Sequence, residues 1–306
     1  MEMLGTYELT GHLTSENAGY SLWGFGQKDG RDYFIKQFLS PKYPENDTVS
    51  SPARLKKKIK QCEDFEAQKL SIYKSLNANT DGNAVRVTEF FRIGTKYYIS
   101  MPKIVALPWT VEDVVALTEK EKRRLCSIIA HGISGIHRGH IIHADLKHDN
   151  VLYMKTKNGN VTAKIIDFDS SFLESATPAP GENIIGDQVY FSPEAVLSMM
   201  GNEVALTCKM DIFALGVLFH QYFAGYLPEF DPEQFNSAGE AVAAGAELKL
   251  CGSMPQDVRR LLEQMLQMDP EKRPTAEMVF RGFLGGGVPT PKPKNQSASF
   301  TIAGDL

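Results

Sequence analysis

The sequence predicts an α+β protein of two lobes, a small β-rich N-terminal lobe with one helix and a larger, mainly helical C-terminal lobe. Residues 7–39 alternate apolar and polar side chains and contain many glycines, which is typical of strands joined by tight turns. Beyond Pro108, apolar residues recur at helical spacing. We expect an N-lobe at 1–104 with a hinge at its end, a C-lobe at 105–285, and a tail at 286–306 rich in Gly, Pro and Ser.

The N-lobe elements follow from local patterns. Residues 22–38 are typical of a hairpin with Lys28-Asp29-Gly30 at its turn. A proline-containing loop at 40–52 separates this hairpin from a helix predicted over 54–76. Two further strands are expected within 84–94 and 96–104, which completes the β-rich lobe.

The C-lobe begins with a helix that Thr118 and Glu121 mark as a capping box. Two short strands are expected within 140–154 and 161–169, with a turn at 156–160 between them, and helices follow to about Phe283. The apolar stretch at 212–227 contains His220 and Gln221. It is too short and too polar for a membrane span and favours a buried helix.

Composition excludes several functional classes. The 306 residues are 42% hydrophobic and carry a net charge of −4, which is typical of a soluble globular protein and does not favour a nucleic-acid partner or a membrane. The four cysteines form no CxxC pair, and the N-terminus lacks the pattern of a signal peptide. We therefore expect reduced thiols and a cytoplasmic location. The sequence assigns no oligomeric state.

Five segments contain residues with chemical potential. In order they are HADLKHDN at 143–150, DFD at 167–169, GDQVYFSPE at 186–194, MDIFALGVLF at 210–219 and DPEKRPTA at 269–276. All five resemble motifs of the eukaryotic-type Ser/Thr protein kinases and occur in that family's order; the first resembles the HRD catalytic loop and the second the DFG motif. The resemblance covers roughly Tyr7 to Leu284 and implies a two-lobed protein-kinase-like fold.

The resemblance implies transfer of the γ-phosphate of ATP to a Ser or Thr hydroxyl of a protein, which can include the chain itself. Asp145 is then expected to orient the substrate hydroxyl and accept its proton. Lys147 is expected to offset charge on the phosphoryl group. Asn150 and Asp167 are expected to ligate Mg²⁺, which prefers oxygen ligands.

Further positions are expected to hold the nucleotide. Lys36 closes an apolar strand where the family keeps its phosphate-anchoring lysine. Its partner should be a glutamate on the next helix, and Glu66 is preferred because Leu70 and Tyr73 follow at four and seven residues, with Glu63 as the alternative. For the rest of the nucleotide site the resemblance implies Gly19 in the glycine-rich loop, Met101 as gatekeeper and Ile104 as a backbone partner of adenine.

The sequence departs from the family pattern at several positions. Thr14 and Glu16 stand where the first two loop glycines are expected. Ala144 replaces the arginine that pairs with a phosphorylated activation loop, so we expect activity independent of such phosphorylation. Asp169 replaces the DFG glycine and should restrict a flip of Phe168, and Asp187 replaces a threonine and can pair with Lys147 as a brace or an autoinhibitory lock.

The predicted function is therefore that of a Ser/Thr protein kinase that uses ATP and Mg²⁺. One alternative is an ATP-binding pseudokinase or scaffold. A second alternative is a small-molecule kinase, which Lys147 and the closing motif at 269–276 disfavour. The sparse glycine loop and compact chain resemble bacterial kinases of eukaryotic type. The resemblance also implies a buried Glu194–Arg273 pair and an Asp211 that bonds the catalytic-loop backbone.

Overall fold

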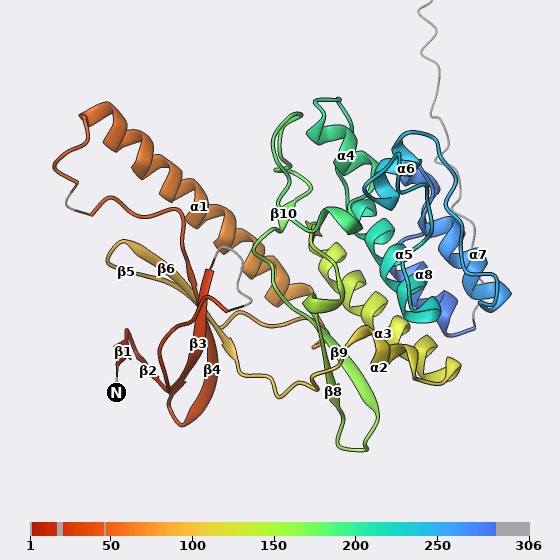
Figure 1. The fold of residues 1–306 in the computed structure, drawn as a ribbon. Coiled ribbons are helices and arrows are strands. Elements are labelled where there is room, and N and C mark those ends of the chain that lie inside the picture. The colour runs from red at the N-terminus through yellow and green to blue at the C-terminus, as the bar shows by residue number, and fades with distance from the viewer. Residues whose placement is uncertain (1, 17–20, 46, 286–306) are drawn as a thin grey trace, which may run out of the picture.

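A computed structural model describes residues 2–16, 21–45 and 47–285 and shows two lobes side by side (Figure 1). The N-lobe is built on an antiparallel sheet of order β1-β2-β3-β4-β6-β5. Its strands are β1 (Met3–Leu4), β2 (Tyr7–Leu9), β3 (Ser21–Lys28), β4 (Arg31–Phe38), β5 (Glu89–Ile93) and β6 (Lys96–Pro102). The single long helix of this lobe, α1 (Pro52–Asn79), extends from beside the sheet to the C-lobe, where it contacts α3, β7 and β10.

The predicted hairpin is confirmed as the pair β3 and β4. Lys28 lies opposite Arg31, so Asp29 and Gly30 alone form the connection. Both residues have positive φ, 50° and 70°, which a type I′ turn requires and which matches the twist of the two strands. The turn sets the register that places Lys36 opposite Trp23.

Helix α1 begins two residues before its predicted start because it is capped before the apolar pattern begins, and it ends three residues after its predicted end. The Ser51 side chain accepts a hydrogen bond from the Arg54 amide, and Pro52 occupies the first turn. The strand predicted within 84–94 is confirmed as β5, but it covers only the second half of that segment and begins at Glu89. Val85 instead donates its amide hydrogen to the Ile165 carbonyl at 2.8 Å, so this stretch is bonded to the other lobe.

The C-lobe contains the helices α2 (Val111–Val115), α3 (Glu119–Arg138), α4 (Pro193–Met199), α5 (Lys209–Ala224), α6 (Ala238–Ala243), α7 (Gln256–Met265) and α8 (Ala276–Phe283). Two small antiparallel sheets pair β7 (Ile141–Ile142) with β10 (Phe172–Leu173) and β8 (Val151–Lys155) with β9 (Val161–Ile165). Three short 3₁₀ turns are η1 (His148–Asn150), η2 (Gln188–Tyr190) and η3 (Pro270–Lys272). Most of the lobe is helical, as predicted.

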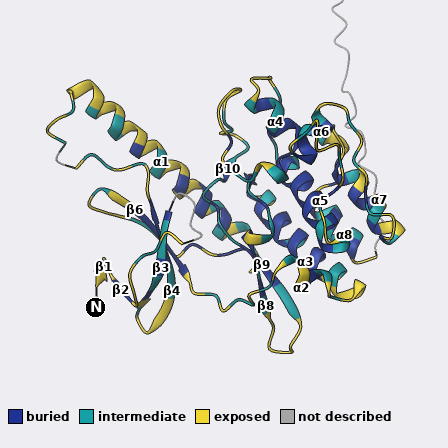
Figure 2. Ribbon diagram, in the orientation of Figure 1, coloured by how far each residue is buried: buried dark blue, intermediate teal, exposed yellow. Residues whose placement is uncertain are grey.

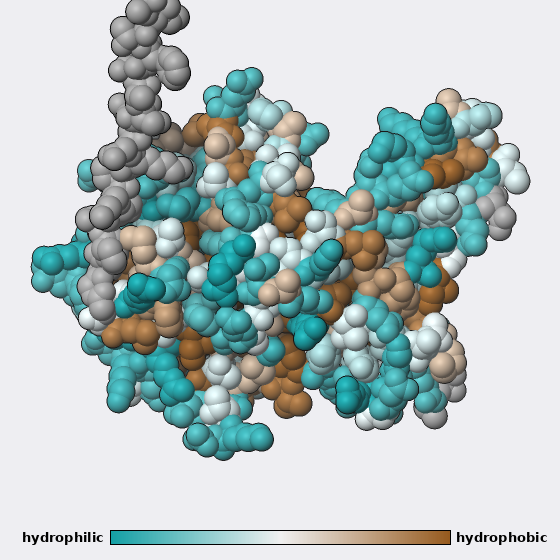
Figure 3. All heavy atoms as spheres, turned by 180° about the vertical axis from the view of Figure 1, so that it is seen from behind, coloured by the Kyte–Doolittle hydropathy of each residue, from teal (hydrophilic) through white to brown (hydrophobic). Residues whose placement is uncertain are grey.

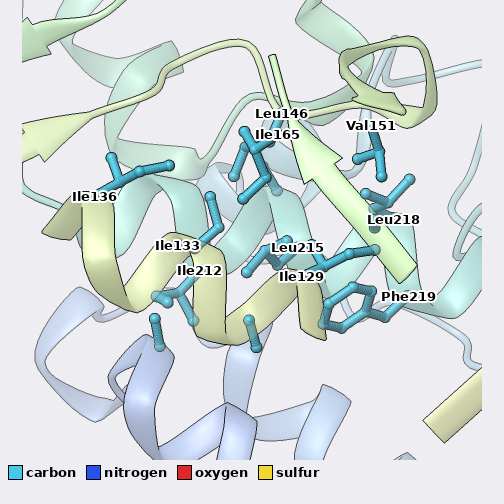
Figure 4. Packing of buried hydrophobic residues seen from close by; sticks show 14 of the residues in the cluster. Ile129, Ile133, Ile136, Leu146, Val151, Ile165, Ile212, Leu215, Leu218 and Phe219 are labelled. Atoms are coloured by element: carbon cyan, nitrogen blue, oxygen red, sulfur yellow. The ribbon is translucent and has the colours of Figure 1, made fainter. Parts of the chain in front are cut away.

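The core of the C-lobe is formed around α3 and α5. The capping box at Thr118 and Glu121 is present, so α3 starts where the sequence predicts. Helix α5 is buried around most of its circumference and ends at Gly225, whose φ of 86° suits a glycine. Figure 2 shows buried residues concentrated in these helices, and Figure 4 shows apolar side chains of α3 and α5 meeting those of the β8–β9 sheet. The segment at 143–150 therefore lies against this core through Leu146.

In the described part of the chain, no helix is long and apolar enough to span a membrane. The rear face is largely hydrophilic, with hydrophobic residues showing in places, including the region where the lobes meet (Figure 3). All four cysteines are free thiols.

Candidate active site

A mainly apolar cavity of about 280 Å³ lies between the two lobes. Trp23 of β3 and Phe34 of β4 line it from the N-lobe, with their rings stacked at 5.6 Å, and Leu152 of β8 lines it from the C-lobe. Met101, the predicted gatekeeper, and Ile104, the predicted backbone partner of adenine, also line this cavity. Its volume is near the lower end for small-molecule sites, so a flat heterocyclic base fits its size and polarity.

Lys36 is held at the inner part of this cavity by two carboxylates. Its ammonium group lies 2.9 and 3.0 Å from the two carboxylate oxygens of Asp167 and 2.7 Å from a carboxylate oxygen of Asp169. Burial opposes the charge on Lys36, but Asp169 and Asp167 outweigh it and raise the pKa of Lys36 above its ordinary value. Lys36 is therefore a fixed cation that faces the space where phosphates would lie.

The predicted Lys36–Glu66 pair is not formed. The Tyr97 hydroxyl donates to a Glu66 carboxylate oxygen at 2.6 Å, and Lys36 pairs with Asp167 and Asp169 instead. Leu70, which supported the choice of Glu66, is 53% exposed and therefore lies outside the core.

The alternative Glu63 is also exposed. The α1 residue that reaches the DFD segment is Lys69, which is 4% exposed and donates to the Asp169 carbonyl at 2.6 Å and the Phe168 carbonyl at 3.4 Å. The sequence contained a signal for Lys69, because it falls on the buried stripe of α1 with Cys62, Tyr73 and Leu76.

The catalytic loop brings three of the predicted residues together. The Asn150 side-chain amide donates to an Asp145 carboxylate oxygen at 2.9 Å and to the Asp145 carbonyl at 2.6 Å. The backbone amide of Asp187 donates a hydrogen bond to the other Asp145 carboxylate oxygen at 2.8 Å, and the Lys147 ammonium lies 3.4 Å from this same oxygen. Asp145 is thus oriented by two hydrogen bonds and has a cation beside it.

Asp211 and His143 form hydrogen bonds to the backbone of this loop. The Asp211 carboxylate accepts the amide hydrogens of His143 at 2.8 Å and Ala144 at 3.0 Å, which confirms the predicted role of Asp211. Ala144 has a φ of 66°, a strained value for a residue with a Cβ atom, and these hydrogen bonds stabilise it there. Phe168 is buried against the His143 ring at 5.0 Å and forms part of the cavity wall.

The residues expected to bind Mg²⁺ offer suitable atoms. Since the amide nitrogen of Asn150 makes both of its hydrogen bonds to Asp145, the side-chain oxygen of Asn150 is left for a cation. Burial opposes the charge on Asp167, yet Lys36 lowers the pKa of this carboxyl below its ordinary value and keeps it ionised.

Among the described residues no group of three or more His, Cys, Asp or Glu side chains gathers into a metal site. Two protein oxygens completed by phosphates and water would match the usual coordination of Mg²⁺.

The glycine-rich loop is described only in part. Gly19 lies outside the described residues, so its predicted contact with the nucleotide stays a prediction. Before that gap, Thr14 pairs with Trp23, and the Trp23 indole donates to the Glu16 carbonyl at 2.7 Å. The Glu16 residue itself is exposed.

Comparison with known proteins agrees with this geometry. A Ca²⁺/calmodulin-dependent serine/threonine-protein kinase of Malus domestica is 33% identical over 156 residues, 50% of this chain and 35% of that protein. Aurora kinase of Schizosaccharomyces pombe is 32% identical over 153 residues, 50% of this chain and 40% of its own length. The serine/threonine-protein kinase Lok of Drosophila melanogaster is 31% identical over 157 residues, 50% of this chain and 32% of its own length.

These curated relatives are longer proteins, and the chain spans about a third of the length of the Malus domestica protein. The family model described as protein kinase domain matches residues 49–282, which is most of the chain and includes the catalytic loop, the DFD segment and the closing motif. The chain therefore belongs to the protein kinase family.

Proposed function

We propose that the chain is an active Ser/Thr protein kinase that transfers the γ-phosphate of ATP to a protein hydroxyl. The observation that carries this proposal is the oriented Asp145 carboxylate, bonded by Asn150 and by the Asp187 amide and set beside the Lys147 ammonium. Phosphoryl transfer depends on positioning and charge stabilisation more than on covalent chemistry, and this arrangement supplies both. Serine/threonine kinases among its relatives support the residue type of the acceptor.

Each residue has a distinct task in the proposed reaction. Asp145 aligns the acceptor hydroxyl and takes its proton, since one carboxylate oxygen can accept a further hydrogen bond. Lys147 stabilises the negative charge that spreads over the transferred phosphoryl group, and Lys36 holds the phosphates of the bound nucleotide. When bound through Asn150 and Asp167, Mg²⁺ would supply charge neutralisation at the phosphates.

The contacts of Asp187 favour a role as a brace for Lys147 over a role as an autoinhibitory lock. Its carboxylate lies 3.7 Å from Lys147, and its other oxygen accepts the Val189 amide hydrogen and so starts η2. Because the Asp187 backbone amide, and not its carboxylate, bonds Asp145, the side chain does not compete for the catalytic oxygen. We infer that Asp187 holds Lys147 in place beside Asp145.

The proposed activity is independent of activation-loop phosphorylation. Ala144 offers no cation to a phosphate, and its methyl group lies in an apolar cluster with Phe172 and Ile184. Ser171 is buried and its hydroxyl donates to the His143 carbonyl at 3.1 Å, so it is a structural residue and no phosphate acceptor.

Alanine at Ser170, Ser175 and Thr177 together should leave the turnover number within about twofold of wild type, since no phosphate contact is lost. A fall of about tenfold or more, on the order of 1.4 kcal/mol in activation free energy, would contradict independence. Mass spectrometry of the wild-type protein after incubation with ATP identifies any of these side chains that is phosphorylated.

The decisive experiment compares the wild type with Asp145→Asn. With Mg²⁺ and labelled ATP, the wild type should phosphorylate itself or members of a Ser/Thr peptide library. The variant should lose transfer by about 10³-fold or more, because the proton acceptor is gone, while its affinity for ATP stays within about threefold.

A wild type that binds Mg²⁺–ATP but transfers no phosphate would instead support the nucleotide-binding scaffold. Phosphorylation of small-molecule alcohols in place of peptides would support the small-molecule kinase.

We propose that the chain is a cytoplasmic protein of bacterial origin that acts on a protein substrate. The relatives named above come from a plant, a yeast and a fly.

A further inference from the structure

Four charged side chains meet where α1, β4 and the DFD segment converge. Lys36 comes from β4, Lys69 from α1, and Asp167 and Asp169 from the DFD segment. The Lys36 ammonium contacts both carboxylates, and the Lys69 ammonium contacts the Asp169 and Phe168 carbonyls. The cluster holds two positive and two negative groups, and the two lysines are buried.

We propose that Asp169 is the positioning partner of Lys36 and that Lys69 occupies the place on α1 from which a carboxylate would otherwise reach this lysine. The carboxylate that partners Lys36 thus lies on the DFD segment, and the position on α1 where a carboxylate was expected is occupied by a lysine. The proposal rests on the proposed function, because the task of Lys36 is to hold nucleotide phosphates.

The position of Lys69 on α1 supports this exchange. Lys69 and Tyr73 are one turn apart, and Tyr73 lines the cavity beside Phe168 and Asp169. The Lys69 ammonium lies over the rings of Phe38 and Phe65, 5.8 and 5.9 Å from their centroids, and these contacts favour its direction. This face of α1 therefore points at the DFD segment.

A lysine at this place cannot pair with Lys36, because both are cations. Lys69 bonds backbone carbonyls instead, and the charge it adds must be balanced nearby, since a buried ammonium without a counter-charge is costly. The Asp169 side chain provides that balance and reaches Lys36 at 2.7 Å. A glycine at position 169 would leave two buried cations facing Asp167 alone.

Asp169 also has a consequence for Asp167. Lys36 contacts both Asp167 oxygens, at 2.9 and 3.0 Å, and those oxygens are also the ones proposed for Mg²⁺. With Asp169 present, Lys36 keeps an anionic partner when Asp167 turns toward a cation. Without it, Lys36 and Asp167 would bind each other more tightly and compete with nucleotide and metal.

The test is a double-mutant cycle on nucleotide affinity, measured by titration of Mg²⁺ and a non-hydrolysable ATP analogue. Asp169→Gly, Asp169→Asn and Lys69→Glu should each weaken binding by about tenfold, the changes at 169 by misplacing Lys36 and the change at 69 by crowding three carboxylates. The double variant Asp169→Gly/Lys69→Glu places one carboxylate on α1 again, so its affinity should return to within about threefold of wild type.

Two further variants sharpen the result. Lys74→Glu makes the same charge change as Lys69→Glu at an exposed position of α1, so its affinity should stay within about twofold of wild type. Glu66→Gln removes the charge of the carboxylate that the sequence predicted as the partner of Lys36. It should weaken binding less than Asp169→Asn, which removes the charge of the observed partner. Thermal unfolding of each variant identifies any that fail to fold.

Three outcomes would overturn the proposal: Asp169→Asn leaves affinity unchanged, the double variant binds no better than the weaker single variant, or Glu66→Gln is the more damaging change. These outcomes are separate from the fate of the proposed function, because affinity is measured without phosphoryl transfer. A wild type that binds the analogue but never phosphorylates a substrate refutes kinase activity alone. Favourable coupling between positions 69 and 169 in that protein still supports the arrangement around Lys36.

Discussion

Removal of Arg273 should be among the most destabilising single changes in the C-lobe. Arg273 is fully buried, and all five of its N–H donors are used. Two reach the Glu194 carboxylate at 2.7 and 2.8 Å, and three reach the carbonyls of Lys209, Gln267 and Met268 at 2.9, 2.7 and 3.1 Å. One side chain therefore ties together the starts of α4 and α5 and the segment that follows α7.

The magnitude follows from what Arg273→Met leaves behind. Methionine retains the apolar volume but leaves the Glu194 carboxylate, which is 4% exposed, without its cation and removes the hydrogen bonds that three carbonyls accept from Arg273. Removal of one member of a buried pair costs about 3–5 kcal/mol in free energy of unfolding. Because whole domains have only about 5–15 kcal/mol, the loss should be visible at once in the unfolding midpoint.

The assay is equilibrium unfolding in urea, followed by far-UV circular dichroism and by tryptophan fluorescence. The chain has two tryptophans, Trp23 in the N-lobe and Trp109 in the C-lobe, so a Trp23→Phe background reports the C-lobe alone. The double variant Glu194→Met/Arg273→Met removes both charges and should recover about 2 kcal/mol or more relative to Arg273→Met. A loss below about 1 kcal/mol for Arg273→Met, or no recovery in the double variant, would refute the reasoning.

Two further predictions concern the pH dependence and one turn. Hydrogen bonds from Arg123 lower the pKa of Asp257 from 3.8 to about 2, so their contribution to stability is fully present above the ordinary pKa and is lost as pH falls from there through the lowered pKa. The stability difference between wild type and Asp257→Asn, about 0.2–1 kcal/mol for so exposed a pair, should shrink between about pH 4 and pH 2, and a constant difference would contradict it. Gly30→Ala should cost about 1–2 kcal/mol in urea unfolding because the φ of Gly30 is 70°. Gly11→Ala, with no neighbouring atom within 4 Å of an added Cβ, is the control, and equal losses in both variants would exclude turn strain as the cause.

Much of the architecture could be predicted because its signals are local. The Asp29-Gly30 turn, the Thr118–Glu121 capping box and the buried α5 are each specified by a few neighbouring residues, and all three are confirmed. The exception at residues 84–88 has a tertiary cause. Their apolar alternation is typical of a strand, but Val85 bonds the backbone of Ile165 in the other lobe.

The spacing within the catalytic loop was also readable from the chain. Asp145, Lys147 and Asn150 lie within six residues, and a short loop with fixed spacing can bring their side chains together without help from distant elements. The structure brings them together, and it adds the Asp187 amide, which the sequence could not supply because it lies 42 residues away.

The partner of Lys36 could not be read in the same way. Glu66 and Lys69 lie three residues apart, so they share one face of α1 and differ in height by about 4.5 Å along its axis. Local periodicity places Lys69 on the buried stripe of α1, but it does not show which element that stripe contacts. The sequence by itself thus determined the order of the elements, the turn and cap residues and the spacing of the catalytic loop, since all depend on neighbouring residues. Only the tertiary structure decided that Lys69 contacts the DFD segment and that Asp169 contacts Lys36. These contacts depend on the position that α1 takes on the core when it buries Cys62, Ile72 and Leu76.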